Sequence, residues 1–362
     1  MKQFNCLSTS SKIAICGLPL RADSYKTCTF GCTYCFSNNR VIRKLAEEEL
    51  QIANVKQLKT KLDKVFNKGQ YDETNLIDVM LLDDLTIHYG ALSDPFCHHE
   101  QEYQVTRQIV EILNEYNKSI LFSTKTDNIY DVPLNPNLHT LQLSFSNNLA
   151  DNYIEPGVAS FESRVRFFNE MKDKGFRVGI RIQPFIPGIT TPEILDYFKD
   201  ADYLSLEGLK LVPQNVELNK CLLEMYNLER DSFTQKGLLN LKPEIRENAY
   251  VEFIAKLKEY NIPFSIADND MRSTTCGKCC CGDPLIRKST DFNTTAMIYN
   301  KGEDYTKDDV LKELDKYKDC SVKGLFTSNR QKDVTTVEDL INVNFDKKTN
   351  PLSPKFQYKK EE

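Results

Sequence analysis

The sequence predicts an α/β fold, a full or partial TIM-like (βα) barrel with a C-terminal cysteine-rich extension. Short apolar segments alternate with helical segments between residues 86 and 268, which is the order of parallel βαβ units. After about residue 270 the sequence becomes richer in lysine and aspartate, and this part opens with the run TTCGKCCCGDP. We therefore expect a barrel domain over 1–270 and an extension with a flexible tail over 271–362.

Six segments have the composition of strands, and we expect a seventh near the first cysteines, which suits a TIM-like barrel. The six segments are 86–92, 119–125, 140–146, 176–186, 202–212 and 262–268. In such barrels the chemistry lies at the carboxyl ends of the strands. The residues at or near those ends are Ser93, Asp94, Lys125, Ser144, Ser146, Arg181, Glu207 and Asp268.

Helices are expected between and after these strands. The segment 160–174 has apolar residues at helical spacing and ends at Gly175, and the segment 243–260 begins at Pro243. The full set of expected helices is 41–67, 100–116, 160–174, 192–199, 243–260, 306–318 and 335–342.

Composition limits the class of protein. The net charge of -5 argues against strong nonspecific binding to nucleic acid, although a local basic groove stays open. The sequence has no apolar run of about 18 residues and no signal-peptide pattern at its start, so we expect no membrane association. Twelve cysteines without a secretion signal indicate a reducing, cytoplasmic setting, where clustered cysteines are metal ligands.

The first such group is Cys28, Cys32 and Cys35, spaced C-x3-C-x2-C. A structural zinc site needs four ligands, whereas a [4Fe–4S] cluster held by three thiolates keeps one iron open. The spacing therefore favours an iron–sulfur cluster with an open iron. Zinc binding and free loop thiols are the alternatives.

This motif, with Tyr34 before its last cysteine, resembles the signature of the radical S-adenosylmethionine (SAM) enzymes. The resemblance implies that SAM chelates the open iron. Its reductive cleavage then gives a 5′-deoxyadenosyl radical, which abstracts hydrogen from a substrate. It also implies that the backbone of Tyr34 lies near the adenine, and that a one-electron donor such as flavodoxin or ferredoxin is the partner.

Further motifs resemble the branch of spore photoproduct lyase and the DNA repair photolyase-like proteins, over about residues 20–270. They are GALSDPF (90–96), STK (123–125), LSFS (143–146), IEP (154–156) and RIQPFIPGI (181–189). The resemblance implies that Ser93 and Asp94 line the SAM pocket. It implies that Lys125, and Arg164 as a second clamp, face the SAM carboxylate, although both could be solvated surface charges. Ser144 and Ser146 would contact the SAM amino-acid part or ribose. Glu155 lies in the following loop.

The reaction itself stays open. The lyase has a hydrogen-donor cysteine two residues before its Ser-Asp pair, where this chain has Ala91, so Cys97 is the candidate donor here. The lyase-like motifs favour a nucleic acid or nucleotide substrate. The acidic charge favours a peptide or small metabolite. A third hypothesis is a non-catalytic zinc-binding interaction protein.

A second group comprises Cys276, Cys279, Cys280 and Cys281. We consider an auxiliary iron–sulfur cluster, a zinc site, or free thiols of which one donates hydrogen. The polar residues just before them line a substrate pocket or form a solvated loop: Asp268, Asn269, Asp270 and Arg272. The pair His98-His99 is expected on the surface near the pocket mouth.

Overall fold

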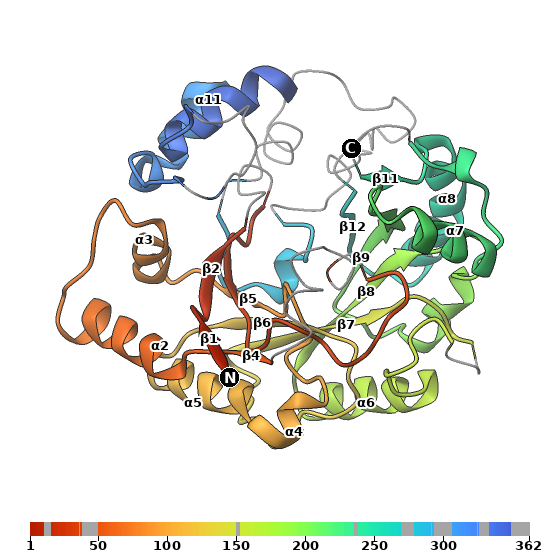
Figure 1. Cartoon of the computed structure of the whole chain (residues 1–362), viewed down its shortest axis with the longest axis horizontal. Helices are drawn as coiled ribbons and strands as arrows, with labels where there is room; N and C mark the ends of the chain where they lie inside the picture. The colour runs from red at the N-terminus through yellow and green to blue at the C-terminus, as the bar shows by residue number, and fades with distance from the viewer. Residues whose placement is uncertain are drawn as a thin grey trace.

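The centre of the molecule is an eight-stranded sheet with the strand order β12-β9-β8-β7-β6-β5-β3-β2 (Figure 1). The computed structural model describes residues 1–10, 16–35, 37, 50–149, 153–234, 238–268, 279–290, 292, 306–323, 325 and 333–348. Seven of the strands run parallel, and β2 pairs antiparallel with β3. The strands are β2 Leu7–Thr9, β3 Leu20–Ala22, β5 Ile87–Tyr89, β6 Ile120–Thr124, β7 His139–Phe145, β8 Arg177–Phe185, β9 Tyr203–Gly208 and β12 Phe264–Ile266.

This sheet is a partial TIM-like barrel. Within the described residues, β2 and β12 are the two ends of the strand order and do not pair with each other. Figure 1 shows the sheet curving, with α2, α4, α5 and α6 along its outer side. The predicted fold class is therefore confirmed, in its partial rather than its full form.

Helices and two small sheets complete the described chain. β1 (Lys2–Phe4) pairs with β4 (Gln51–Ala53), and β10 (Lys210–Leu211) pairs with β11 (Leu239–Asn240). The helices are α2 Val55–Leu62, η2 Asp63–Asn67, α3 Leu76–Leu82, α4 His99–Tyr103, α5 Val105–Glu115, α6 Phe161–Asp173, η3 Pro192–Tyr197, α7 Val216–Met225, η4 Arg230–Ser232, α8 Pro243–Glu259, η6 Asp283–Leu285, α10 Lys307–Glu313, η7 Asp315–Tyr317 and α11 Val337–Lys348. None of the helices in this part of the chain is long and apolar enough to cross a membrane.

Several boundaries differ from the sequence predictions for local reasons. The helix expected over 100–116 is two helices, because Gln104 adopts a left-handed backbone (φ 49°) between α4 and α5. The strand expected over 202–212 ends at Gly208, after which β10 pairs with β11 instead of continuing in the barrel. The segment expected as a helix over 192–199 is the 3₁₀-helix η3. Of the one or two helices expected over 41–67, residues 41–49 lie outside the described part, Gln51–Ala53 form the strand β4 instead, and α2 and η2 follow it.

The two faces of β7 show how the barrel is filled. Its odd-numbered residues include Phe145, whose ring packs 5.7 Å from Phe161 of α6, in the outer apolar layer. Side chains alternate between faces along a strand, so Thr140, Gln142 and Ser144 point the other way, into the interior of the barrel. The interior face of β7 is therefore polar, whereas its outer face is apolar.

Residues 279–286 of the extension lie inside this curve. Thr140 Oγ1 donates to the carbonyl of Leu285 (2.6 Å), and Gln142 Nε2 donates to that of Cys281 (3.2 Å). Leu285 packs against Gly179 of β8, where an added Cβ would lie 2.4 Å from Leu285 Cδ1. This segment thus closes the barrel at the end opposite the carboxyl ends of its strands.

The later part of the extension packs on α3. Asp83, which follows α3, accepts hydrogen bonds from Lys316 and Tyr317 of η7 and from Lys288 Nζ (2.6 Å). The described residues from 279 onward therefore contact both the barrel interior and α3.

We predict that Leu285→Ala lowers the free energy of unfolding by about 2–5 kcal/mol, because the side chain is fully buried against a glycine that cannot refill the cavity. Urea denaturation monitored by circular dichroism measures this. Leu82→Ala is the matched control, since Leu82 is 42% exposed, and its change should stay within about 0.5 kcal/mol. Equal effects of the two substitutions would contradict the placement of 279–286 inside the barrel.

Candidate functional site

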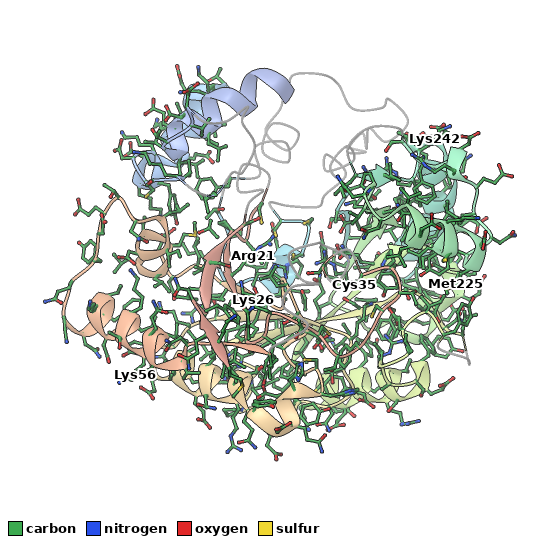
Figure 2. All side chains as sticks on the ribbon, in the orientation of Figure 1. Arg21, Lys26, Cys35, Lys56, Met225 and Lys242 are labelled. Atoms are coloured by element: carbon green, nitrogen blue, oxygen red, sulfur yellow. The ribbon has the colours of Figure 1, made fainter. Side chains whose placement is uncertain are left out.

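The loop that carries Cys28, Cys32 and Cys35 follows β3 and lies over the carboxyl ends of the parallel strands. Neighbouring segments hold it by backbone contacts. Ser93 Oγ donates to the carbonyl of Tyr25 (2.6 Å), and the amide of Gly157 donates to the carbonyl of Phe30 (2.9 Å). All three cysteines are half-buried. Figure 2 shows Cys35 in the central region of the molecule, whereas Lys56 and Lys242 lie near its periphery.

The approach of Gly157 to this loop leaves no room for a side chain. A Cβ at Gly157 would lie 2.8 Å from both the Cα and the carbonyl oxygen of Phe30. Thr33 adds a second contact, since its amide donates to the carbonyl of Ile154 (3.0 Å). The loop therefore has a fixed position on the segment that contains Glu155.

Ser93 and Asp94 form hydrogen bonds with other residues of the protein. Asp94 accepts hydrogen bonds from Thr124 Oγ1 (2.7 Å), the amide of Lys125 (2.7 Å) and the amide of Phe96 (3.0 Å). Burial raises the pKa of Asp94 to about 6. Because Ser93 holds the cysteine loop and Asp94 holds the end of β6, this pair fixes the loop relative to Lys125. Their contact with SAM stays a prediction.

Glu155 is the centre of the charged site. Its buried carboxylate accepts from Ser146 Oγ (2.9 Å) and from the hydroxyl of Tyr34, and it pairs with Lys125 Nζ (2.8 Å) and Arg164 (3.3 Å). Burial alone would raise the pKa of Glu155, but the two cations lower it to about 2. One carboxylate thus joins the cysteine loop, β6, β7 and α6.

Lys125 and Arg164 are therefore not solvated surface charges. The side chain of Lys125 is 14% exposed and that of Arg164 is 2% exposed. Arg164 also donates to the carbonyl of Ser144 (2.9 Å), and its guanidinium lies 4.6 Å from the ring centre of Phe145. Arg164 therefore binds Glu155 from the buried side, whereas Lys125, at the end of β6, stays partly accessible to solvent.

The remaining predicted ligands of SAM lie around this centre. Tyr34 and Ser146 both contact Glu155, and the ring of Tyr34 lies 5.6 Å from Lys125 Nζ. Ser144 lies on the interior face of β7, and its carbonyl accepts from Arg164. The structure brings these residues together without testing their contact with a ligand.

Cys97 is fully buried against the cysteine loop. Its thiol shares a hydrogen bond with that of Cys28. The rings of His98 and His99 lie 5.5 Å from Phe30 and Tyr25, respectively. Cys97 therefore contacts a predicted cluster ligand, and its role as hydrogen donor stays a prediction.

A second buried carboxylate, Glu207, lies near the carboxyl end of β9. It pairs with Arg181 (3.5 Å) and Lys210 and accepts from Gln183 Nε2. Asp268, predicted to line a substrate pocket, instead pairs with Arg246 (3.2 Å) and accepts from Tyr250 (2.9 Å) and the amide of Gly208 (3.1 Å). Asp268 thereby ties β9 to α8. Asn269, Asp270 and Arg272 lie outside the described residues.

The second cysteine group is also inside the barrel. The Sγ atoms of Cys279, Cys280 and Cys281 all lie within 4.8 Å of one another. Cys276, the fourth predicted member, lies outside the described residues. Cys28, Cys32 and Cys35 are described but do not form so tight a group.

Sequence reasoning missed several contacts of the site. Tyr226, just after the unpredicted α7, shares a hydrogen bond with Thr33 (2.6 Å). Gln183 accepts from Lys125 through its backbone carbonyl (3.4 Å). The polar alternation of β7 and β8, with Gln142, Arg181 and Gln183 facing inward, was the signal that could have identified the polar interior.

Several solved structures have a fold similar to that of this chain. A mutant of spore photoproduct lyase with bound AdoMet and dinucleoside spore photoproduct has a TM-score of 0.50 at 14% sequence identity, over 67% of this chain and 74% of that chain. Another mutant of that lyase, with dinucleoside spore photoproduct, has a TM-score of 0.49 at 14% identity, over 66% and 72%. Streptococcus suis SuiB bound to S-adenosylmethionine has a TM-score of 0.38 at 15% identity, over 60% and 49%. No family model and no curated protein matches the chain. The chain thus has the barrel fold of spore photoproduct lyase.

We predict that Glu155→Gln lowers the free energy of unfolding at pH 7 by about 3 kcal/mol, because it leaves two buried cations without their carboxylate. The pKa of Glu155 is lower in the folded chain than its ordinary value of 4.5, so this stabilisation is complete above pH 4.5. It is lost as the pH falls through that value toward about 2. Urea denaturation of both proteins at several pH values measures the difference.

Glu170→Gln is the control, since Glu170 forms an exposed pair with Lys174, and its change should be below about 0.5 kcal/mol. A difference between the Glu155 variant and the unaltered chain that does not shrink with acidification would contradict this assignment.

Proposed function

We propose that the chain is a radical SAM enzyme in which Cys28, Cys32 and Cys35 hold a [4Fe–4S] cluster. When bound, the cluster supplies one-electron cleavage of SAM to a 5′-deoxyadenosyl radical, which abstracts hydrogen from the substrate. The observation that carries this proposal is the position of the three thiols. They lie on one anchored loop at the carboxyl ends of parallel strands, beside a buried carboxylate with two cations. The fold of spore photoproduct lyase supports it.

The donor set fits the cluster. Each thiolate of a [4Fe–4S] cluster binds a different iron, so the three sulfurs are farther apart than around a single ion. Cys28, Cys32 and Cys35 do not form a group with all Sγ atoms within 4.8 Å, so they are not spaced around a single ion. Burial and the nearby Glu155 raise the pKa of Cys32 to about 12, so loading of the site requires the loss of a proton from this thiol.

Lys125 is the residue that we propose for the carboxylate of SAM. An ammonium has three N–H donors. Among the described residues, Lys125 Nζ contacts the carboxylate of Glu155 and the carbonyl of Gln183, which leaves one donor for an anionic ligand. Glu155 and Arg164 position this ammonium from the buried side. Tyr34, Ser93, Asp94, Ser144 and Ser146 surround it and are the proposed lining of the same pocket.

A nucleotide or nucleic acid is the proposed substrate class. Glu155 and Glu207 each pair with two cations, so basic side chains lie inside a chain whose net charge is -5. An interior of this kind favours a phosphate-bearing ligand. We also propose a flavodoxin- or ferredoxin-type electron donor and a cytoplasmic location, in keeping with the lack of disulfides among the cysteines that the structure describes.

We predict that Cys32→Ala abolishes SAM-dependent formation of 5′-deoxyadenosine, because the cluster loses one of three ligands. The measurement is chromatography of reactions with anaerobically reconstituted protein and dithionite. Cys221→Ala is the matched control, since Cys221 is exposed on α7, and should retain full formation. Undiminished formation with Cys32→Ala would contradict the proposal. A colourless protein with stoichiometric zinc would favour the interaction-protein hypothesis instead.

We predict that a DNA oligonucleotide raises the rate of 5′-deoxyadenosine formation above that with SAM alone, since substrate consumes the radical productively. Deuterium transfer from a deuterated oligonucleotide into 5′-deoxyadenosine checks the site of abstraction. A peptide mixture serves as comparison. Stimulation by peptides and not by the oligonucleotide would overturn the substrate class and leave the SAM chemistry intact.

A further inference from the structure

The barrel interior contains a group of three thiols that the proposed SAM chemistry does not use. Cys279 and Cys281 are buried and Cys280 is half-buried, and their Sγ atoms all lie within 4.8 Å of one another. Each thiol shares hydrogen bonds with the other two. Consecutive residues of a strand would point to opposite faces, but these form a turn in which the amide of Gly282 donates to the carbonyl of Cys279 (3.0 Å).

The barrel holds this turn rigidly. Gln142 Nε2 of β7 donates to the carbonyl of Cys281 (3.2 Å), and Ser265 Oγ of β12 donates to that of Cys280 (2.8 Å). Gly282 has a left-handed backbone (φ 99°), and a Cβ there would lie 2.4 Å from the ring of Tyr203. The three thiols are thus presented by a turn that two strands fix and a third closely contacts.

The spacing of the thiols discriminates between the metal centres considered for them. A tetrahedral ion with metal–sulfur bonds of about 2.3 Å places its sulfur ligands about 3.8 Å apart. The observed limit of 4.8 Å accommodates that separation. A [4Fe–4S] cluster needs its thiolates on different irons and therefore farther apart. The group has the dimensions of a site for a single ion.

The surroundings suit a thiolate-bound ion. The amide of Cys281 lies 3.4 Å from Cys279 Sγ, in position to donate to that sulfur. Three thiolates around a divalent ion carry a net negative charge, and the cation Arg181 lies close to them. Burial alone would lower the pKa of Arg181, but Cys281 and Glu207 raise it above its ordinary value, so the guanidinium stays charged beside the thiols.

We infer that Cys279, Cys280 and Cys281 bind a single soft divalent cation of the Zn²⁺ class inside the barrel. Each thiol releases its proton to solvent as it coordinates. The ion fixes residues 279–286 in the barrel, close to Arg181. Its fourth position is left for a further ligand. This site is independent of the proposed SAM chemistry at Cys28, Cys32 and Cys35.

The test uses the full chain with Cys28, Cys32 and Cys35 changed together to Ala, so that the first site cannot contribute. We expect this protein to bind about one Co²⁺ per chain, with thiolate-to-cobalt charge-transfer absorption that added Zn²⁺ removes. Adding Cys279→Ser and Cys281→Ser should abolish the absorption. Adding Cys221→Ser and Cys320→Ser instead should leave it unchanged, since these cysteines lie on α7 and beside Glu73, respectively.

Alkylation of the unaltered chain gives a readout that does not depend on the folding of a variant. Zn²⁺ should slow iodoacetamide labelling of Cys280, the half-buried member of the group, in peptide mass spectra and leave that of the exposed Cys221 unchanged. Absence of cobalt absorption, its survival in the Cys279→Ser/Cys281→Ser protein, or unprotected labelling would each overturn the single-ion site. Binding of about four irons that these two substitutions remove would overturn it in favour of a cluster. None of these results depends on SAM cleavage.

Discussion

The buried carboxylate of Glu155 is the interaction on which the arrangement of the candidate site depends. It joins Tyr34 of the cysteine loop, Lys125 at the end of β6, Ser146 after β7 and Arg164 of α6. An unpaired buried charge is costly, so each of these groups is held by the others. The carboxylate therefore sets both the position of the cysteine loop and the direction of the Lys125 ammonium.

A second buried carboxylate in the barrel also pairs with two cations. Glu207, near the carboxyl end of β9, pairs with Arg181 and Lys210, and the thiols of 279–281 lie close to Arg181. The interior is therefore divided between charged groups near the carboxyl ends of the strands and a thiol-lined, apolar closure at the other end. The closure is built from the extension, since Leu285 fills the space that Gly179 leaves on β8. The extension is consequently part of the barrel interior as well as an addition to its surface.

The order of strands and helices could be predicted from the sequence because each strand has enough apolar residues to be recognised by itself. The sequence also predicted that the three cysteines share one loop and that Lys125 lies at the end of a strand. It could not show that Asp94 and Asp268 bind the chain's own backbone, because those partners are brought close only by the fold. Nor could it show that Arg164 is buried, since a helix with a weak apolar stripe leaves the exposure of a single arginine open. The break at Gln104 depends on one left-handed residue, which no periodicity reveals.

The account depends most on the claim that Cys28, Cys32 and Cys35 hold an iron–sulfur cluster with an iron open to SAM. The most direct measurement is the electron paramagnetic resonance spectrum of the anaerobically reconstituted, dithionite-reduced protein with and without SAM, together with its iron and sulfide content. We predict about four irons and four sulfides per chain and a signal that shifts when SAM is added. A protein without iron, or a cluster signal that SAM leaves unchanged, would contradict the account.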